Sequence, residues 1–232
     1  MIRVIAIDGP AASGKSSTAA LVARALGWAH LDSGALYRAL TLVAVDRLRD
    51  EGRGTGEGWS AQRILALAED LPVRLVFVGE SFRPEVAGVD VEAAIRSERV
   101  TAHVSAVAAL PDVRTWVNAR QRGAVREHPA GVVVDGRDIG TVVFPDAPLK
   151  VFLTATPDER ARRRITQRGQ AIDADRLSRE SQALAARDVA DASRPVAPLK
   201  PAADAVILDS TALSLQAQVE QVVALARERF PR

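Results

Sequence analysis

The chain carries the stretch Gly9-Pro10-Ala11-Ala12-Ser13-Gly14-Lys15-Ser16-Ser17 near its N-terminus. This stretch fits the pattern G-x-x-x-x-G-K-[ST] of a phosphate-binding loop. The preceding run, Ile2 to Asp8, is apolar and rich in β-branched residues, which is typical of a buried parallel strand. The following run, Thr18 to Leu26, has helical spacing and strong helix formers. Since the motif requires a strand, a glycine turn and a helix, the sequence predicts a nucleoside triphosphate site at residues 9–17.

The residue types in this loop suit a bound polyphosphate. Gly9 and Gly14 permit backbone angles that a Cβ atom would forbid, so successive N–H groups can point at one anion. Lys15 is expected to reach the β- and γ-phosphates, and Ser16 offers a hydroxyl oxygen to Mg²⁺. The alternative is a glycine turn that merely joins a strand to a helix, and the agreement of motif and context disfavours it.

The composition is that of an ordinary globular protein. The 232 residues are 47% hydrophobic and 26% charged, with a net charge of +2. This near balance argues against a general nucleic-acid binder, and no apolar stretch is long enough to span a membrane. The absence of cysteine excludes thiolate catalysis and cysteine-ligated zinc. The histidines, His30, His103 and His128, lack metal-ligand spacing and are interpreted as ordinary core or surface residues.

Five short apolar runs predict the core strands of the fold. Helical patterns separate them, which is the arrangement of a doubly wound α/β protein. We therefore expect a five-stranded parallel sheet of the P-loop type with helices on both faces. The predicted strands cover residues 2–8, 28–31, 131–136, 149–153 and 205–209.

The region between the second and third of these strands has a different pattern. Two runs, 73–78 and 85–88, predict strands joined by a turn over 79–84. They would form a small antiparallel insertion near residues 71–91. Helices are expected around this insertion over 35–49, 62–69 and 97–128, with a break near Pro111 and a glycine-rich loop at 50–60.

Asp135-Gly136-Arg137-Asp138 follows the third core strand. Ligands of open α/β sheets bind at this carboxyl edge. Asp135 is placed like an acid that holds Mg²⁺ directly or through water, and Arg137 could clamp a phosphate with two hydrogen bonds. The alternative is a simple Asp-Gly turn at the end of a strand, and the nearby phosphate loop favours the functional interpretation.

A second polar stretch, Asp32 to Arg38, follows the second strand. Ser33 or Asp32 can cap the next helix, and local evidence alone favours that structural role. Arg38 lies about one turn into the helix, from where its long side chain could reach back to a phosphate.

The segment from Asp158 to Arg194 is the richest in charge and has a local excess of arginine. A solvated pair of helices joined by salt bridges is one interpretation. The other is a lid, because phosphoryl transfer needs arginines over the developing charge and the exclusion of water. Together with the phosphate loop, the segment is interpreted as a lid.

The chain resembles the bacterial cytidylate kinases, P-loop proteins of the nucleoside monophosphate kinase family, over nearly its whole length. The resemblance implies a core domain of residues 1–34, 129–156 and 195–232, a monophosphate-binding region of 35–128, and a lid of 157–194. Besides the phosphate loop, it rests on three motifs: Leu31-Asp32-Ser33-Gly34-Ala35-Leu36-Tyr37-Arg38, Asp135-Gly136-Arg137-Asp138-Ile139-Gly140-Thr141-Val142-Val143-Phe144-Pro145 and Pro195-Val196-Ala197-Pro198-Leu199.

The resemblance also implies which residues bind the acceptor nucleotide. Ser105 and Arg114 would read the cytosine edge, since a hydroxyl and a guanidinium suit its donors and acceptors. Arg187 and Asp191 would contact the sugar. The whole acceptor set is Asp32, Ser33, Arg38, Ser105, Arg114, Arg137, Arg187 and Asp191.

The catalytic set follows from the same motifs. Arg187, Asp191 and Arg194 match the lid pattern R-D-x-x-D-x-x-R, in which Arg194 would contact the phosphates. Ser16 and Asp135 would hold the metal, although the division of roles between Asp135 and Asp138 stays open. The catalytic residues are then Lys15, Asp135, Arg137, Asp138, Arg187 and Arg194.

The resemblance implies an ATP-dependent, Mg²⁺-requiring kinase that converts CMP and dCMP to their diphosphates. We expect a cytoplasmic monomer that binds neither nucleic acid nor membrane, since the N-terminus runs directly into a strand and nothing demands more subunits. One rival is a P-loop kinase for UMP, AMP or a metabolite hydroxyl, which would not need Ser105 and Arg114. Another rival is a P-loop NTPase switch or nucleic-acid-binding regulator, which the balanced charge disfavours.

Overall fold

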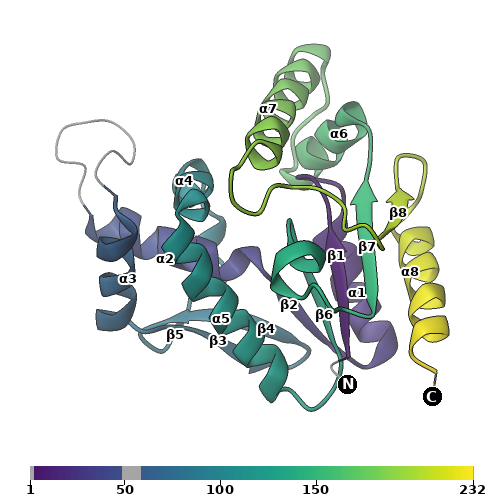
Figure 1. Cartoon of the computed structure of the whole chain (residues 1–232). Coiled ribbons are helices and arrows are strands. Elements are labelled where there is room, and N and C mark those ends of the chain that lie inside the picture. Colours follow the sequence, from purple (N-terminus) through teal and green to yellow (C-terminus); the bar gives the residue numbers. More distant parts are fainter. Residues whose placement is uncertain (1–2, 49–58, 232) are drawn as a thin grey trace. The chain divides into compact units, whose positions relative to one another are not determined.

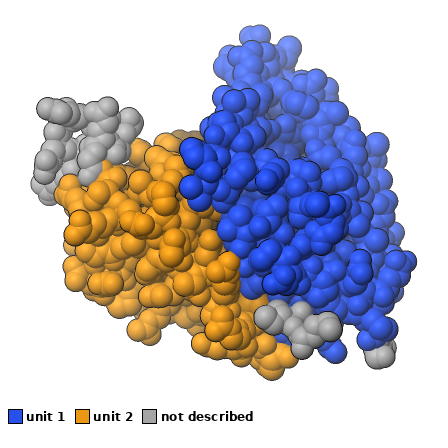
Figure 2. All heavy atoms as spheres, viewed as in Figure 1, with its two compact units in different colours: residues 1–30, 130–232 blue, residues 31–129 orange. Residues whose placement is uncertain are grey.

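The computed structural model describes residues 3–48 and 59–231. The chain divides into two compact units, residues 1–30 with 130–232 and residues 31–129, which Figure 2 colours blue and orange. The glycine-rich loop expected at 50–60 lies outside the described residues except for its last two positions. Across the described ranges, no helix is both long enough and apolar enough to traverse a bilayer.

The first unit is built on parallel strands (Figure 1). β1 (Val4–Asp8) pairs in parallel with β6 (Val132–Gly136) on one side and with β7 (Leu149–Thr154) on the other. β8 (Val206–Asp209) pairs in parallel with β7. β2 (Ala29–Asp32), which begins in this unit, follows β6 in the strand order. These are the five expected core strands, and the α/β class is confirmed.

The core of the first unit lies between these strands and two helices. α1 (Lys15–Leu26) and α8 (Leu215–Arg229) contact each other and the strands, and their Val22 and Val222 are fully buried. β1 is buried at all five positions because it has a strand on each side and helix packing above it. Its continuous apolar run in the sequence reflects that central place.

Two further helices of the first unit pack side by side, α6 (Pro157–Gln167) and α7 (Ala174–Ala192) (Figure 1). They cover most of the arginine-rich segment. Ala161 of α6 and Leu184 of α7 form a small buried cluster with Ala11 of the phosphate loop. Apolar packing therefore holds these helices on the loop.

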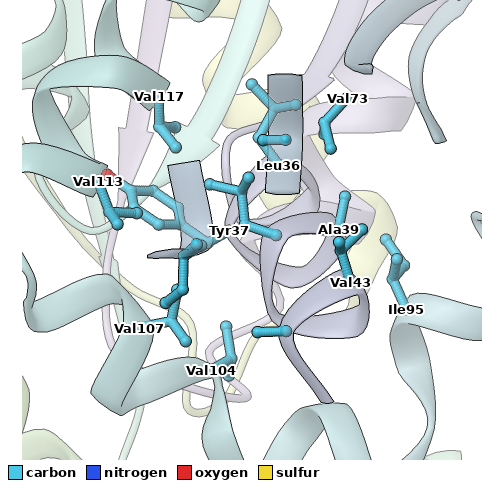
Figure 3. Packing of buried hydrophobic residues seen from close by; sticks show 14 of the residues in the cluster. Leu36, Tyr37, Ala39, Val43, Val73, Ile95, Val104, Val107, Val113 and Val117 are labelled. Atoms are coloured by element: carbon cyan, nitrogen blue, oxygen red, sulfur yellow. The ribbon is translucent and has the colours of Figure 1, made fainter. Parts of the chain in front are cut away.

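The second unit has a mainly helical core. Four helices build it: α2 (Gly34–Arg47), α3 (Ala61–Asp70), α4 (Glu98–Ala109) and α5 (Pro111–Glu127). The break expected near Pro111 is confirmed, because this proline begins α5, where its missing N–H costs nothing. Figure 3 shows how side chains of three helices meet, including Leu36, Tyr37, Val43, Val104, Val107, Val113 and Val117.

The antiparallel insertion is present in the second unit, but both bounds predicted for its second strand, 85 and 88, are wrong. β3 (Val73–Val78) matches the prediction, whereas the next strand, β4, covers Ser81–Val86 where a turn over 79–84 was expected. Pro84 lies opposite Leu75 inside this ladder, and its carbonyl accepts from the N–H of Val91 at 3.1 Å. A proline removes only a donor, so a strand can continue through a position that uses the carbonyl. β5 (Val89–Asp90) completes the insertion.

Candidate active site

The phosphate loop joins β1 to α1, and its glycines are required by the backbone. Gly9 has φ +156°, and a Cβ atom there would lie 2.1 Å from the carbonyl oxygen of Leu153. Gly14 has φ +92° and precedes the first residue of α1. The helix start has no side-chain cap, so the positive end of α1 faces the loop. This is the geometry that an anion-binding loop needs.

The next two residues of the motif make defined contacts. Lys15 Nζ donates to the carbonyl of Pro10 in the same loop at 3.2 Å. Ser16 Oγ donates to Asp135 Oδ2 at 2.5 Å, although the two residues are 119 positions apart. Because β1 and β6 are neighbours in the sheet, the loop after β1 and the acid at the end of β6 meet at one edge.

The second oxygen of Asp135 is held by a residue that the sequence reasoning missed. His30 Nε2 lies 2.8 Å from Asp135 Oδ1, and the carboxylate can only accept, so Nε2 donates. Burial alone would raise the pKa of Asp135, but the hydrogen bond and charge of His30, together with Lys15, bring it below the usual range. His30 was interpreted as ordinary. The one available signal was a polar side chain inside a short apolar strand.

Ser16 and Asp135 offer oxygen ligands, the type that Mg²⁺ prefers. Within residues 3–48 and 59–231, no cluster of three or more histidine, cysteine or acidic side chains could hold a metal on its own. The pair therefore suits an ion that takes its remaining ligands from nucleotide phosphates and water. The donor chemistry fits the expected cofactor.

Arg137 connects the motif after β6 to the phosphate loop. Its guanidinium donates to the carbonyl of Gly9 at 2.7 Å and to Asp191 Oδ2 at 2.9 Å. Arg194 donates from Nε to the backbone carbonyl of the same Asp191 at 3.3 Å. The structure thus brings together two predicted residues of the lid pattern and the Asp-Gly-Arg-Asp motif. Asp138 follows in the chain and is 4% exposed.

Asp8, at the end of β1, is a second residue that the sequence reasoning missed. Its carboxylate accepts from the N–H groups of Ile139 and Gly140 at 2.8 and 2.7 Å. These are the first residues of a π-helical turn, η2 (Ile139–Val143), directly after Asp138. Burial raises the pKa of Asp8 to about 6, against the lowering effect of the two backbone hydrogen bonds. Asp8 therefore ties the strand before the phosphate loop to the segment after Asp138.

Arginines of α6 hold the phosphate loop from the other side. Arg160 donates to the carbonyl of Ala11 at 3.2 Å, and Arg163 donates to that of Ser13 at 3.1 Å. Both side chains serve the loop backbone, which keeps its N–H groups available for an anion.

Other charges in this segment form salt bridges between the two helices. Glu180 of α7 pairs with Arg164 at 3.1 Å and with Arg168 at 2.8 Å. Arg187 is partly buried on α7. The salt-bridged helix pair and the contacts with the phosphate loop therefore coexist in one segment.

In the second unit, the predicted cap is formed by one of its two candidates. Asp32 Oδ1 accepts from the N–H of Gly34 at 2.8 Å, and its other oxygen pairs with Arg96 at 3.3 Å. Ser33 makes no capping hydrogen bond with its side chain. Its hydroxyl and carbonyl accept instead from Gln121 Nε2, at 3.2 and 3.0 Å. The sequence reasoning missed Gln121, which carries no motif.

The remaining acceptor-site candidates lie on helices of this unit. Arg38 donates to the carbonyl of Ile95 at 3.3 Å and to Thr101 Oγ1 at 3.0 Å. Arg114 is buried on α5, with its guanidinium carbon 5.6 Å from the ring centre of Tyr37. Ser105 is exposed on α4.

A glycine loop at the start of a helix, an acid on the neighbouring strand and arginines on the loop backbone are the parts that phosphoryl transfer uses. The fold and this site define a P-loop phosphotransferase.

Comparisons with known proteins identify the family within this class. The family model for cytidylate kinase matches residues 5–228, and the chain belongs to that family. The cytidylate kinase of Pseudomonas savastanoi pv. phaseolicola is 48% identical over 225 residues, which cover 95% of this chain and 93% of that protein. That of Pseudomonas aeruginosa (strain UCBPP-PA14) is 48% identical over 227 residues, covering 96% and 94%.

A solved structure of an uncharacterized protein from Eubacterium ventriosum has the same general fold. It superposes with a TM-score of 0.52 at 11% identity, covering 97% of this chain and 99% of that one. At this identity the likeness speaks for the fold alone.

Proposed function

We infer that this protein transfers the γ-phosphoryl group of ATP to the phosphate of CMP or dCMP. A phosphate oxygen of the acceptor forms a bond to the γ-phosphorus as the bond to the β-phosphate oxygen breaks, which yields ADP and CDP or dCDP. The acceptor phosphate is already a nucleophile, so this step requires no general base. The observation that carries the inference is the match to the cytidylate kinase family across residues 5–228.

For the donor side, we propose that residues 9–17 bind the ATP phosphates through backbone N–H groups and Lys15. Ser16 and Asp135 would hold Mg²⁺, with His30 fixing the carboxylate. When bound, Mg²⁺ neutralises charge on the ATP phosphates. The hydrogen bond from Ser16 to Asp135 supports this assignment, because it places two hard oxygen donors within one ion's reach.

For the acceptor side, we propose that Ser33, Arg38 and Arg137 hold the monophosphate and that Ser105 and Arg114 contact the cytosine. Asp32 supports Ser33 by taking over the cap of α2. Arg187 and Asp191 would contact the sugar. The family resemblance supports these roles, and each can be tested by substituting the residue.

We also propose that residues 157–194 act as a lid on a core of 1–34, 129–156 and 195–232, with 35–128 binding the monophosphate. Arg137, Arg187 and Arg194 would then stabilise charge on the transferred group, with Asp138 beside the acceptor. Electrostatic stabilisation by such groups is the main contribution available to a phosphoryl-transfer enzyme.

The oligomeric state and the location of the enzyme are also part of the proposed function. We propose that it works as a monomer in the cytoplasm and binds no nucleic acid, in keeping with a net charge of +2. Light scattering coupled to size-exclusion chromatography measures the oligomeric state directly.

The decisive experiment follows ADP formation from Mg-ATP with CMP, dCMP, UMP, AMP and no acceptor side by side. Turnover confined to CMP and dCMP is the expected result. Preferred turnover of UMP or AMP would leave a P-loop kinase but refute the cytosine assignment. Equal ADP formation with and without an acceptor would instead point to a nucleotide hydrolase.

A further inference from the structure

We propose that Gln121 is a positioning residue that orients the Ser33 hydroxyl so that it donates to the phosphate of the acceptor nucleotide. The inference rests on the proposed function, in which Ser33 holds that phosphate. Gln121 lies in none of the motifs found in the sequence.

Gln121 and Ser33 make two contacts within the second unit. Gln121, on α5, has no exposed surface, and Ser33 is 5% exposed. Gln121 Nε2 lies 3.0 Å from the carbonyl oxygen of Ser33 and 3.2 Å from its Oγ. The residues are 88 positions apart, so only the packing of α5 beside the start of α2 joins them. A buried amide whose NH₂ group donates to two atoms of one residue restricts the position of that residue.

The chemistry of the two groups sets the direction of these hydrogen bonds. A backbone carbonyl can only accept, so it requires the NH₂ end of the Gln121 amide to face Ser33. The same NH₂ group can only donate, so the Ser33 hydroxyl accepts from it. A hydroxyl that accepts still has its own hydrogen to donate elsewhere.

The first turn of α2 makes no use of the Ser33 oxygen either. Ser33 occupies the N-cap position of α2, where a serine oxygen ordinarily accepts from the first turn. With φ −58° and ψ −29°, it makes no such bond, and Asp32 takes the N–H of Gly34 instead. Gln121 thus holds the Ser33 oxygen in place, and the hydroxyl can donate its own hydrogen to an added acceptor, such as a phosphate oxygen. Fixing a polar group in advance lowers the entropy lost on binding.

The test compares ligands with and without a phosphate. Gln121→Met keeps the length of the side chain and removes the donor. We expect its dissociation constant for CMP, measured by titration calorimetry, to rise by about threefold to tenfold, the range for loss of one hydrogen bond. Cytidine lacks the phosphate and should bind as it does to the wild type. Gln216→Met, on the exposed side of α8, is the matched control and should change neither constant.

A second substitution separates positioning from general damage. In a Ser33→Ala background, Gln121→Met should weaken CMP binding by less than about twofold, because residues that act through each other are not additive. The inference would be overturned if Gln121→Met lowered the affinity for CMP by the same factor in the Ser33→Ala background as in the wild type. It would also be overturned if Gln121→Met lowered the affinities for CMP and cytidine equally. If Gln121→Met fails to fold, Gln121→Leu serves the same comparison, because its side chain also cannot donate.

Binding of CMP to the wild-type protein distinguishes a failure of the proposed function from a failure of the role of Gln121. Wild-type protein that binds no CMP refutes the proposed function and this inference with it. Wild-type protein that binds CMP, together with a Gln121→Met variant of unchanged affinity, refutes the role of Gln121 alone.

Discussion

Arg137 links the phosphate loop to the lid pattern through its side chain. It donates to Gly9 of the phosphate loop and to Asp191 of the lid pattern. A forked guanidinium can serve two partners at once, which lysine cannot do in the same geometry. The Arg137 side chain therefore lies within reach of phosphates bound at the loop and contacts α7 through Asp191.

Arg137→Ala should lower turnover by about 10²- to 10³-fold, the range for removing one group that stabilises transition-state charge. The KM for CMP should rise, whereas that for ATP should change by only about threefold, since the loop keeps its backbone donors. Steady-state kinetics with each substrate varied in turn measures this. Arg168→Ala removes an exposed partner of Glu180 and serves as control. Unchanged turnover in Arg137→Ala would contradict its assignment.

Asp8 provides a prediction on pH. Its pKa is raised from 3.8 to about 6 by burial, so between these values the folded chain keeps a proton that the unfolded chain has released. The stability contributed by this group is complete below about pH 4 and is lost as pH rises through 6. The loss amounts to about 3 kcal/mol, from about two pKa units at about 1.4 kcal/mol each.

Asp8→Asn should remove this dependence. Urea unfolding of both proteins from pH 4 to pH 8 gives the difference in their free energies of unfolding, in which titrating groups that do not interact with Asp8 cancel. We expect the difference to shift in favour of asparagine by about 3 kcal/mol up to about pH 6 and then to level off. A difference that is constant with pH would show that Asp8 is not a buried carboxylate of raised pKa.

Among the elements, the antiparallel insertion shows where pattern reading succeeds and where it does not. β3 has the predicted bounds because its apolar run is bounded by turn residues. β4 begins earlier than predicted because Pro84 was treated as a turn residue, although its carbonyl alone serves the ladder. The two-residue turn after β4, Ala87-Gly88, has positive φ at both positions, +50° and +79°. Such a turn favours asparagine before glycine.

Ala87→Asn should therefore raise the free energy of unfolding by about 0.5–1 kcal/mol, because alanine pays a steric cost in the left-handed region. Thermal or urea unfolding measures the change, and turnover should stay that of the wild type. Ala87→Val supplies the opposite case, since a β-branched side chain is still less compatible with positive φ. A valine variant as stable as the asparagine variant would show that the turn does not limit stability.

At the scale of the whole molecule, the metal should matter for catalysis and not for the fold. The described residues contain no three-ligand cluster, and Ser16 and Asp135 already satisfy each other by a hydrogen bond. We expect EDTA to abolish turnover and to shift the melting temperature of the nucleotide-free protein by less than about 1 °C. Excess Mg²⁺ should restore turnover. A melting temperature that falls steeply with EDTA would mean that a metal holds the fold together.

Local signals were enough for the α/β class, the phosphate loop and most helix and strand positions. The glycines at 9 and 14, the apolar run of β1 and the proline that starts α5 each act within a few residues, so the sequence shows them directly. The family motifs extended this reading to the acceptor and lid residues. Those assignments remain predictions to be tested by substitution.

The long-range partners of the site residues were decided by packing alone. His30 meets Asp135 across 105 positions, Ser16 meets the same acid across 119, and Gln121 meets Ser33 across 88. No periodicity encodes such pairs, because strand order and helix packing, rather than spacing along the chain, bring them within hydrogen-bond distance. The same holds for the raised pKa of Asp8, since burial depends on what the rest of the unit places around a carboxylate.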